Sequence, residues 1–162
     1  MRPEEQDLLG EVTVAAYRAV YAGTGRDLPD FYEAELRYVA GRAVDADMLV
    51  AVETGPGGRL LGGVTYVPGP ESSSAEFEFE DAAGIRALAV APDAQGRGVG
   101  EALTRACVER ARAAGKAQLV LHSTDWMTAA HRLYERLGFE RVPSLDWQPL
   151  PDFWLRAFRL KL

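Results

Sequence analysis

A glycine-rich turn near the middle of the chain has the residue types and spacing of an anion-binding site. The segment Gln95-Gly96-Arg97-Gly98-Val99-Gly100 follows an apolar, β-like stretch and precedes a run with helical spacing. Glycines permit positive φ angles and close approach of a ligand to the backbone. A helix N-terminus adds unpaired N–H groups and a partial positive charge, and successive N–H groups can surround a phosphate. The turn therefore predicts a phosphate or pyrophosphate site.

Three phosphate-binding motifs compete for this turn, and their spacing separates them. A P-loop needs Lys and then Ser or Thr after its last glycine, but the only Gly-Lys pair, Gly115-Lys116, precedes Ala117. A dinucleotide fingerprint needs a third glycine where Glu101 stands, and it belongs to a βαβ unit that the start of this chain does not show. The pattern [Gln/Arg]-x-x-Gly-x-[Gly/Ala] is matched in full by residues 95–100.

Together with two further segments, this pattern resembles the GNAT superfamily of acyl-CoA-dependent N-acetyltransferases. Leu88-Ala89-Val90-Ala91-Pro92 is similar to the family's pantetheine-pairing strand, directly before the pyrophosphate turn. The segment from Ala130 to Phe139 is similar to its A-x-x-L-Y-x-x-x-G-F motif. The likeness is strong over residues 85–139 and agrees in element order elsewhere. It implies one GNAT-like domain over residues 1–162, with acetyl-CoA as the cosubstrate.

The resemblance also implies roles for individual residues. The implied acyl-CoA contacts are Leu88, Ala89, Val90, Gln95, Gly96, Arg97, Gly98, Val99, Gly100, Glu101, Met127, Ala130 and Tyr134. A backbone N–H between Leu88 and Val90 is the implied donor to the oxyanion, and Tyr134 is the implied acid for the leaving thiolate. The alternative for Tyr134 is a packing role in the core. With one Cys and two His, the chain is not expected to bind a metal.

Two positions depart from the family pattern, and they leave the catalytic base open. The family often has Glu immediately before the Ile of the central strand, where this chain has Gly84. It also often has Asn seven residues before the tyrosine, where this chain has Met127. An amine with a pKa of about 10.4 must lose a proton before it attacks a carbonyl. Another group must therefore take that proton, or the amine must arrive neutral from bulk water.

The candidates for this base lie in an acidic segment and at the end of a later strand. Glu78, Glu80 and Asp81 belong to the segment 71–81, which has five acidic residues and no basic one. A carboxylate there could take the amine proton through a water molecule. The other candidate for the base is His122, because imidazole changes its charge near neutral pH. A partly buried histidine at a strand end, with no catalytic role, is the alternative for His122.

The charge of the chain restricts its partners. Its 24 acidic and 18 basic residues give a formal charge of −6, whereas a general nucleic-acid binder presents a basic surface. The acidic segment could attract a cationic acceptor, either a small-molecule or a peptide amine, and a solubilising loop is the alternative.

Trp126, Trp147 and Trp154 are candidates to line an acceptor pocket. Because of the two departures, an acyl-CoA-binding sensor or interaction module with little turnover is the alternative function.

The elements that must position these residues follow from hydrophobic periodicity and turn signals. Helices are predicted from Asp7 to Tyr21, from Asp30 to Val44, from the glycine turn to about Ala114, and from Trp126 to Leu137 with Asp125 as N-cap. Strands are predicted at 48–52, 60–67, 85–91, 119–122, 139–142 and 154–162, with one more in the acidic segment. The fold class is therefore mixed α/β. The resemblance implies a mostly antiparallel sheet with helices on both faces, splayed between the strands at 85–91 and 118–122.

Length and hydropathy fit one such domain. The 162 residues correspond to about one domain at roughly 150 residues each. No apolar run approaches the roughly 20 residues of a membrane span, and no apolar region follows Met1 to Glu5 as in a signal peptide. We therefore expect no membrane contact and a cytoplasmic location. A homodimer is expected from the resemblance and from the apolar terminal strand.

Overall fold

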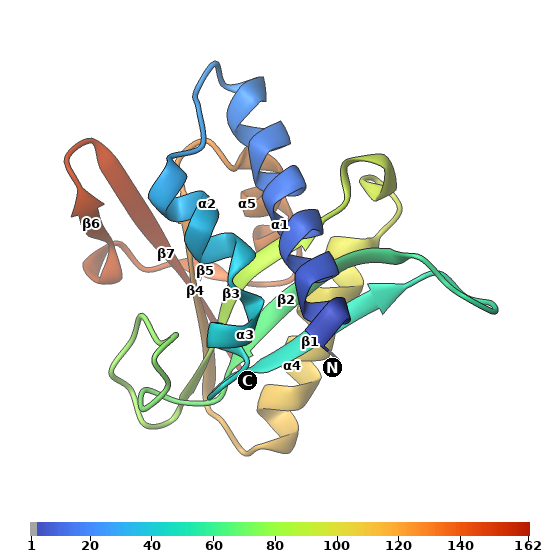
Figure 1. Cartoon of the computed structure of the whole chain (residues 1–162). Coiled ribbons are helices and arrows are strands. Elements are labelled where there is room, and N and C mark those ends of the chain that lie inside the picture. The colour runs from blue at the N-terminus through green and yellow to red at the C-terminus, as the bar shows by residue number, and fades with distance from the viewer. Residues whose placement is uncertain (1–2) are drawn as a thin grey trace.

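The computed structural model describes residues 3–162, so Met1 and Arg2, the first two residues of the segment expected not to be a signal peptide, lie outside it. Figure 1 shows helices on both sides of one twisted sheet. The helices are α1 (Pro3–Gly23), α2 (Asp30–Arg37), α3 (Val39–Arg42), α4 (Val99–Ala113) and α5 (Thr128–Arg136), with 3-10 turns η1 (Pro92–Ala94) and η2 (Pro143–Leu145). The strands are β1 (Asp47–Val52), β2 (Leu60–Val67), β3 (Ala82–Val90), β4 (Gln118–Thr124), β5 (Glu140–Arg141), β6 (Trp147–Leu150) and β7 (Phe153–Lys161).

The described residues form a seven-stranded mixed sheet in the order β1-β2-β3-β4-β7-β5, with β6 also paired to β7. The β3–β4 pair is parallel and the other pairs are antiparallel. This arrangement confirms the predicted mixed α/β class. Among residues 3–162, no helix is both long and apolar enough to cross a bilayer.

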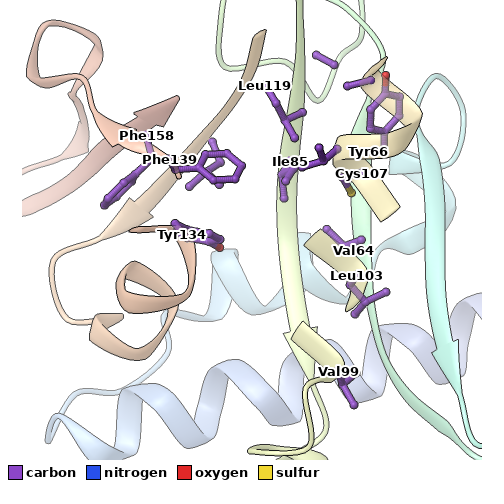
Figure 2. Close-up of a cluster of buried hydrophobic side chains, with 14 of the residues drawn as sticks. Val64, Tyr66, Ile85, Val99, Leu103, Cys107, Leu119, Tyr134, Phe139 and Phe158 are labelled. Carbon is purple, nitrogen blue, oxygen red and sulfur yellow. The ribbon is translucent and has the colours of Figure 1, made fainter. Parts of the chain in front are cut away.

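Two apolar cores cover the two faces of the sheet. On one face, α4 and α5 pack against the strands through residues such as Leu103, Cys107 and Tyr134, as Figure 2 shows. Cys107 is fully buried there, as expected of a core residue, and burial raises the pKa of its thiol to about 12. On the other face, α1 and α2 bury a cluster that includes Tyr17 and Leu36. Both faces of the sheet are therefore buried against helices, and this packing fixes the positions of the strands.

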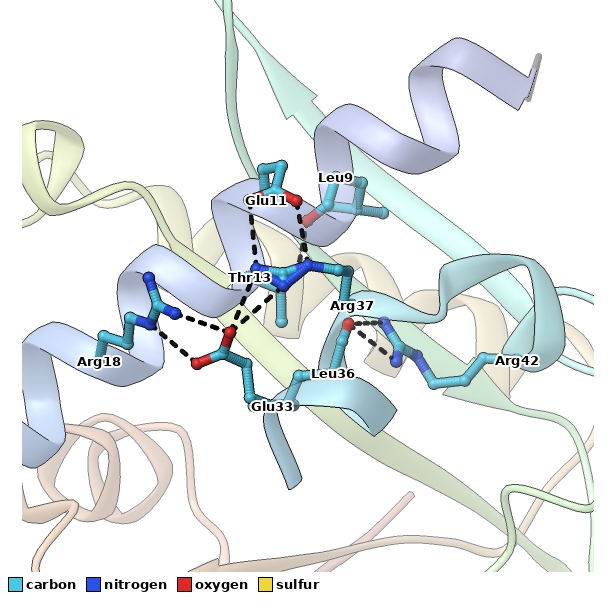
Figure 3. Close-up of polar contacts among 8 residues, drawn as sticks. All are labelled: Leu9, Glu11, Thr13, Arg18, Glu33, Leu36, Arg37 and Arg42. Carbon is cyan, nitrogen blue, oxygen red and sulfur yellow. Dashed lines mark hydrogen bonds and ion pairs between the residues drawn. The ribbon is translucent and has the colours of Figure 1, made fainter. Parts of the chain in front are cut away.

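The N-terminal helices are fixed to each other by a close approach and by ion pairs. A Cβ on Gly10 would lie 2.4 Å from the Arg37 carbonyl oxygen, so this glycine inside α1 permits contact with α2. Glu33 on α2 pairs with Arg18 at 2.7 Å and with Arg37 at 3.2 Å (Figure 3). Arg37 also pairs with Glu11 of α1. These contacts hold α2 at one side of the opening described below.

Three predicted elements differ from those observed. The helix predicted over 30–44 is interrupted at Tyr38, where ψ is 69°, and the buried Arg42 side chain donates to the carbonyls of Glu35 and Leu36 at the end of α2. The predicted acidic strand is instead an irregular segment, 71–81, of turns, a bend and residues without regular structure. Asp125 is not the N-cap of α5, because Met127 occupies that position and the Asp125 carboxylate pairs with Arg156 at 2.6 Å.

Candidate functional site

The central feature is an opening between β3 and β4. The two strands pair from Ala82 to Ile85 against Gln118 to Leu121, and the described residues show no ladder between them beyond that point. β4 continues to Thr124 along β7, so β3 is the strand that diverges. Two residues of β3 stand opposite Val64 of β2, and one of them, Ala87, has a φ of 49°. This β-bulge turns β3 away from β4 and confirms the predicted splay.

The glycine turn lies at the carboxyl end of β3. Gly96 and Gly98 have φ angles of 74° and 80°, and a Cβ at either position would meet no atom within 4 Å. Gly98 directly precedes α4, so the N–H groups of the first helical turn face the same space. The turn therefore combines an open, left-handed backbone with a helix N-terminus, which fits a phosphate group.

Few side chains compete for this space. Arg97 is exposed and reaches Glu53 at 3.5 Å, and the Gln95 amide lies 3.5 Å from the Val90 carbonyl. Glu101 points to Arg105 and Arg136, which lower the pKa of its carboxyl group through hydrogen bonds. The backbone, rather than the side chains, consequently forms the anion cradle.

A small cavity occupies the opening itself. Leu88, Met127, Ala130 and Tyr134, all expected from the sequence to touch the acyl-CoA, line it together with His122. In Figure 2 the Tyr134 ring projects from α5 toward β3. It is 5% exposed, and burial raises the pKa of its hydroxyl above the ordinary value. Tyr134 therefore keeps its proton throughout the neutral pH range.

A second cavity adjoins the first and shares Tyr17, Arg86, Ala87 and His122 with it. Its walls come from α1 and α2 on one side and from β6 and β7 on the other. The shared residues place the two cavities end to end along β3. A ligand in the second cavity would thus reach the first one past His122.

His122 is held by two contacts at this junction. Its side chain is 3% exposed, and its Nε2 lies 3.0 Å from the Leu145 carbonyl oxygen. Because a carbonyl oxygen only accepts hydrogen bonds, Nε2 must carry a proton. The Nδ1 atom faces a Glu76 carboxylate oxygen at 3.4 Å. With the proton on Nε2, Nδ1 is the ring nitrogen that can accept a hydrogen bond or a proton, and the Glu76 carboxylate lies beside it.

The remaining charges of the second cavity are paired. The Arg86 guanidinium contacts Glu35 at 2.9 Å and Glu76 at 3.3 Å. Burial lowers the pKa of Arg86, but the two carboxylates outweigh that effect and leave the pKa above its ordinary value. Arg86 is therefore a permanent cation, and the cavity keeps one excess negative charge from its two glutamates.

The structure separates the base candidates. His122 lines the cavity, whereas Glu78, Glu80 and Asp81 are exposed and are not among its lining residues. Within the acidic segment, the carboxylate that lines the cavity is Glu76, which was not among the candidates. The glutamates of this segment alternate with Phe77 and Phe79, which predicts that the two residue types face opposite sides. This alternation could not show which of the carboxylates points into the cavity.

The position that the resemblance associates with Glu has a steric reason to be glycine. A Cβ on Gly84 would lie 2.6 Å from a ring carbon of Phe77. The irregular segment thus inserts Phe77 over β3 at this point. The adjacent Glu76 places a carboxylate in the cavity, which Gly84 cannot do because it has no side chain.

Of the other residues considered, Trp147 lines the second cavity and Trp126 and Trp154 do not. Trp126 packs against Tyr21 and Phe153, and Trp154 is partly exposed beneath Arg156. His131 bonds to Ser123 at 3.2 Å and packs on Phe158, so it is half-buried rather than on the surface.

We expect Asp146→Asn to destabilise the segment that carries the Leu145 carbonyl. Hydrogen bonds from Arg141, the Ala157 N–H and Arg156 lower the pKa of Asp146 to about 2. Because the folded pKa lies below the unfolded value of about 3.9, the stabilisation is full above pH 4 and disappears as the pH falls through 2. The variant should lose about 1–3 kcal/mol near neutral pH.

Urea unfolding of both proteins between pH 2 and 7 tests this prediction. Asp152→Asn is the matched control, because Asp152 is exposed at the tip of the same hairpin with a φ of 60°, which Asn tolerates. An Asp146→Asn deficit that is the same at pH 2 and pH 7 would contradict the assignment.

Comparison with known proteins agrees with this geometry. Residues 15–139 match the Acetyltransferase (GNAT) family. The mycothiol acetyltransferase of Geodermatophilus obscurus is 40% identical over 96 residues, which are 57% of this chain and 29% of that protein. The chain therefore spans less than a third of that relative.

Solved structures share the fold over the whole domain. A GNAT-family acetyltransferase from Staphylococcus aureus superposes with a TM-score of 0.73 at 11% identity, covering 100% of this chain and 96% of that one. The PaiA N-acetyltransferase of Thermoplasma acidophilum, solved with coenzyme A, gives 0.69 at 14% identity, covering 100% and 96%. These neighbours show that the fold is that of the GNAT acetyltransferases. This chain belongs to the GNAT acetyltransferase family.

Proposed function

We propose that this protein transfers the acetyl group of acetyl-CoA to a primary amine by direct attack. One observation carries the proposal: Tyr134 and His122 line the same cavity in the opening between β3 and β4, Glu76 lies beside His122, and the glycine turn follows the diverging end of β3. The family match and the coenzyme A bound to a structural neighbour support the same donor. Two substrates could then meet beside Tyr134 from opposite ends.

The donor end is formed by backbone. Gly96, Gly98 and the start of α4 would hold the pyrophosphate, since their N–H groups face open space. The pantetheine arm would follow the edge of β3 that β4 leaves unpaired, between Arg86 and Val90. A backbone N–H on this edge can donate to the carbonyl oxygen where negative charge develops.

Two proton transfers complete the reaction, and the chain has a group for each. Acetyl-CoA supplies an acyl carbon with a thiolate leaving group. His122 would accept a proton from the attacking amine at Nδ1, and Glu76 would stabilise the resulting imidazolium. Tyr134 would donate its hydroxyl proton toward the departing sulfur, because burial keeps that hydroxyl neutral. Glu78 and Glu80 have no role in this proposal.

We expect Tyr134→Phe to lower kcat by about 10²–10⁴-fold, as for loss of a general acid, while acetyl-CoA affinity changes little. Tyr66→Phe is the matched control. It removes a hydroxyl from another fully buried tyrosine whose oxygen has no hydrogen-bond partner in the described residues. Steady-state kinetics and calorimetric binding of acetyl-CoA provide the two readouts. Equal kcat values for wild type and Tyr134→Phe, with chemistry rate-limiting, would reduce Tyr134 to a packing residue.

The proposal as a whole is tested by thiol release from acetyl-CoA in the presence of a panel of primary amines. Amine-dependent release, with the acetylated amine identified by mass spectrometry, is the expected result. Tight binding of acetyl-CoA with no product from any amine would instead favour the acyl-CoA sensor. The homodimer and the cytoplasmic location stay predictions of the sequence.

A further inference from the structure

The second cavity is lined by aromatic rings on two facing sides. Phe31 and Tyr32 project from the start of α2, and Trp147 and Phe153 come from the β6–β7 hairpin. Tyr32 bridges the sides, with its ring centroid 6.2 Å from that of Phe153 at an interplanar angle of 79°. The lining of this cavity, called the slot below, thus suits a ring or a bulky apolar group.

Several of these apolar side chains remain open to water. Phe31 is 56% exposed, Trp147 41% and Leu150 41%, and all three line the same cavity. Large apolar side chains that gather around a concave site mark a binding surface, because burying them against a ligand is favourable. The rim therefore has unused apolar surface directly above the His122–Glu76 pair.

The charges of the cavity distinguish between ligands. Arg86 Nη2 is shared between Glu35 and Glu76, and its Nη1 lies 3.5 Å from the Ser74 carbonyl, so its guanidinium is already engaged. A ligand carboxylate would meet two glutamates and no free cation among the described lining residues. Tyr17 and Tyr32 stay neutral, because burial raises the pKa of both hydroxyls. A cationic headgroup is favoured, and an anionic one is repelled.

Building on the proposed function, we infer that the acceptor is a small primary amine carried on an aromatic ring or a comparably bulky apolar group, without a carboxylate beside the nitrogen. The amine nitrogen lies at the His122–Glu76 pair and the ring lies between α2 and the β6–β7 hairpin. The excess negative charge attracts the ammonium form, and His122 then takes its proton. Trp147 and Phe31 are specificity residues that act on binding of the ring.

Matched amines test this inference. 2-Phenylethylamine should have a kcat/KM about 10- to 100-fold above that of propylamine, which lacks the ring. L-Phenylalanine, the same molecule with an added carboxylate, should fall at least about 10-fold below 2-phenylethylamine because of repulsion by Glu35 and Glu76. Preference for spermidine, for propylamine or for a peptide N-terminus would overturn the inference and leave the acetyltransferase reaction standing.

Two variants locate the effect in the slot. Trp147→Ala and Phe31→Ala should each raise the KM for 2-phenylethylamine about 10-fold, with little change in kcat or in the KM for propylamine. Trp154→Ala is the matched control, since Trp154 is exposed to a similar degree but does not line the cavity. An unchanged KM in both slot variants would overturn the inference. Absence of acetyl transfer to every amine would instead refute the proposed function.

Discussion

Gly98→Asp is expected to abolish binding of acetyl-CoA, with a loss of at least about 100-fold in affinity. The wild-type residue has a φ of 80° and opens directly onto the N-terminus of α4. An aspartate there adds a carboxylate where the pyrophosphate would lie, and two like charges in close contact cost several kcal/mol. Each 1.4 kcal/mol is a tenfold change in affinity. Acetyl-CoA should therefore raise the Tm of the wild type but not that of the variant.

Gly115→Asp is the control for charge and backbone strain. Gly115 has a φ of 70° and open space around its Cβ position, but it follows the C-terminus of α4, at the opposite end of the helix. Both variants should lose some intrinsic stability, since L residues rarely adopt this φ. Only Gly98→Asp should lose the rise in Tm that acetyl-CoA causes. Equal shifts in the two variants would show that the glycine turn does not hold the donor.

His122→Ala is expected to lower kcat/KM by about 10²–10⁴-fold, because it removes the group that takes the proton of the amine. Glu76→Gln should produce a smaller loss of about 10- to 100-fold. It leaves the imidazole in place but replaces the carboxylate that faces Nδ1 at 3.4 Å, and a nearby opposite charge favours the charged form of a titratable group. Initial rates with one amine at several pH values measure both effects.

His131→Ala supplies the comparison, because His131 is the other histidine of the chain and lines neither the first nor the second cavity. It should retain near wild-type kcat/KM. The donor-induced Tm shift reports whether each variant is folded and holds acetyl-CoA. A folded His122→Ala protein with an undiminished rate would show that the amine loses its proton to another group or to bulk water.

The donor half of the site could be predicted from the sequence because its signals are local. A glycine that needs positive φ, a helix start and an apolar strand lie within 20 consecutive residues, and the structure has β3, the turn and α4 in that order. The bounds of β2 were predicted correctly, since Pro68 ends its apolar run. The splay between β3 and β4 followed from the resemblance rather than from periodicity.

The acceptor half could not be predicted in the same way because tertiary contacts determine it. Glu76 reaches His122 only because Phe77 packs where Gly84 has no side chain, and nothing local to residues 71–81 specifies that contact. The contact of His122 with the Leu145 carbonyl joins residues 23 positions apart. The break at Tyr38 likewise depends on a buried Arg42, which bonds to the carbonyls at the end of α2.

Different elements line the second cavity and form the proposed donor site, and this separation determines which part of the enzyme can be changed alone. The walls of the second cavity come from α1, α2 and the β6–β7 hairpin, whereas the proposed donor cradle comes from the turn after β3 and from α4. Within the hairpin, β6 pairs only with β7 among the described strands, so it lies at an edge of the sheet. Exchanging residues 147–153 should therefore change which acceptors the enzyme binds, while the residues proposed to hold the acyl donor stay unchanged.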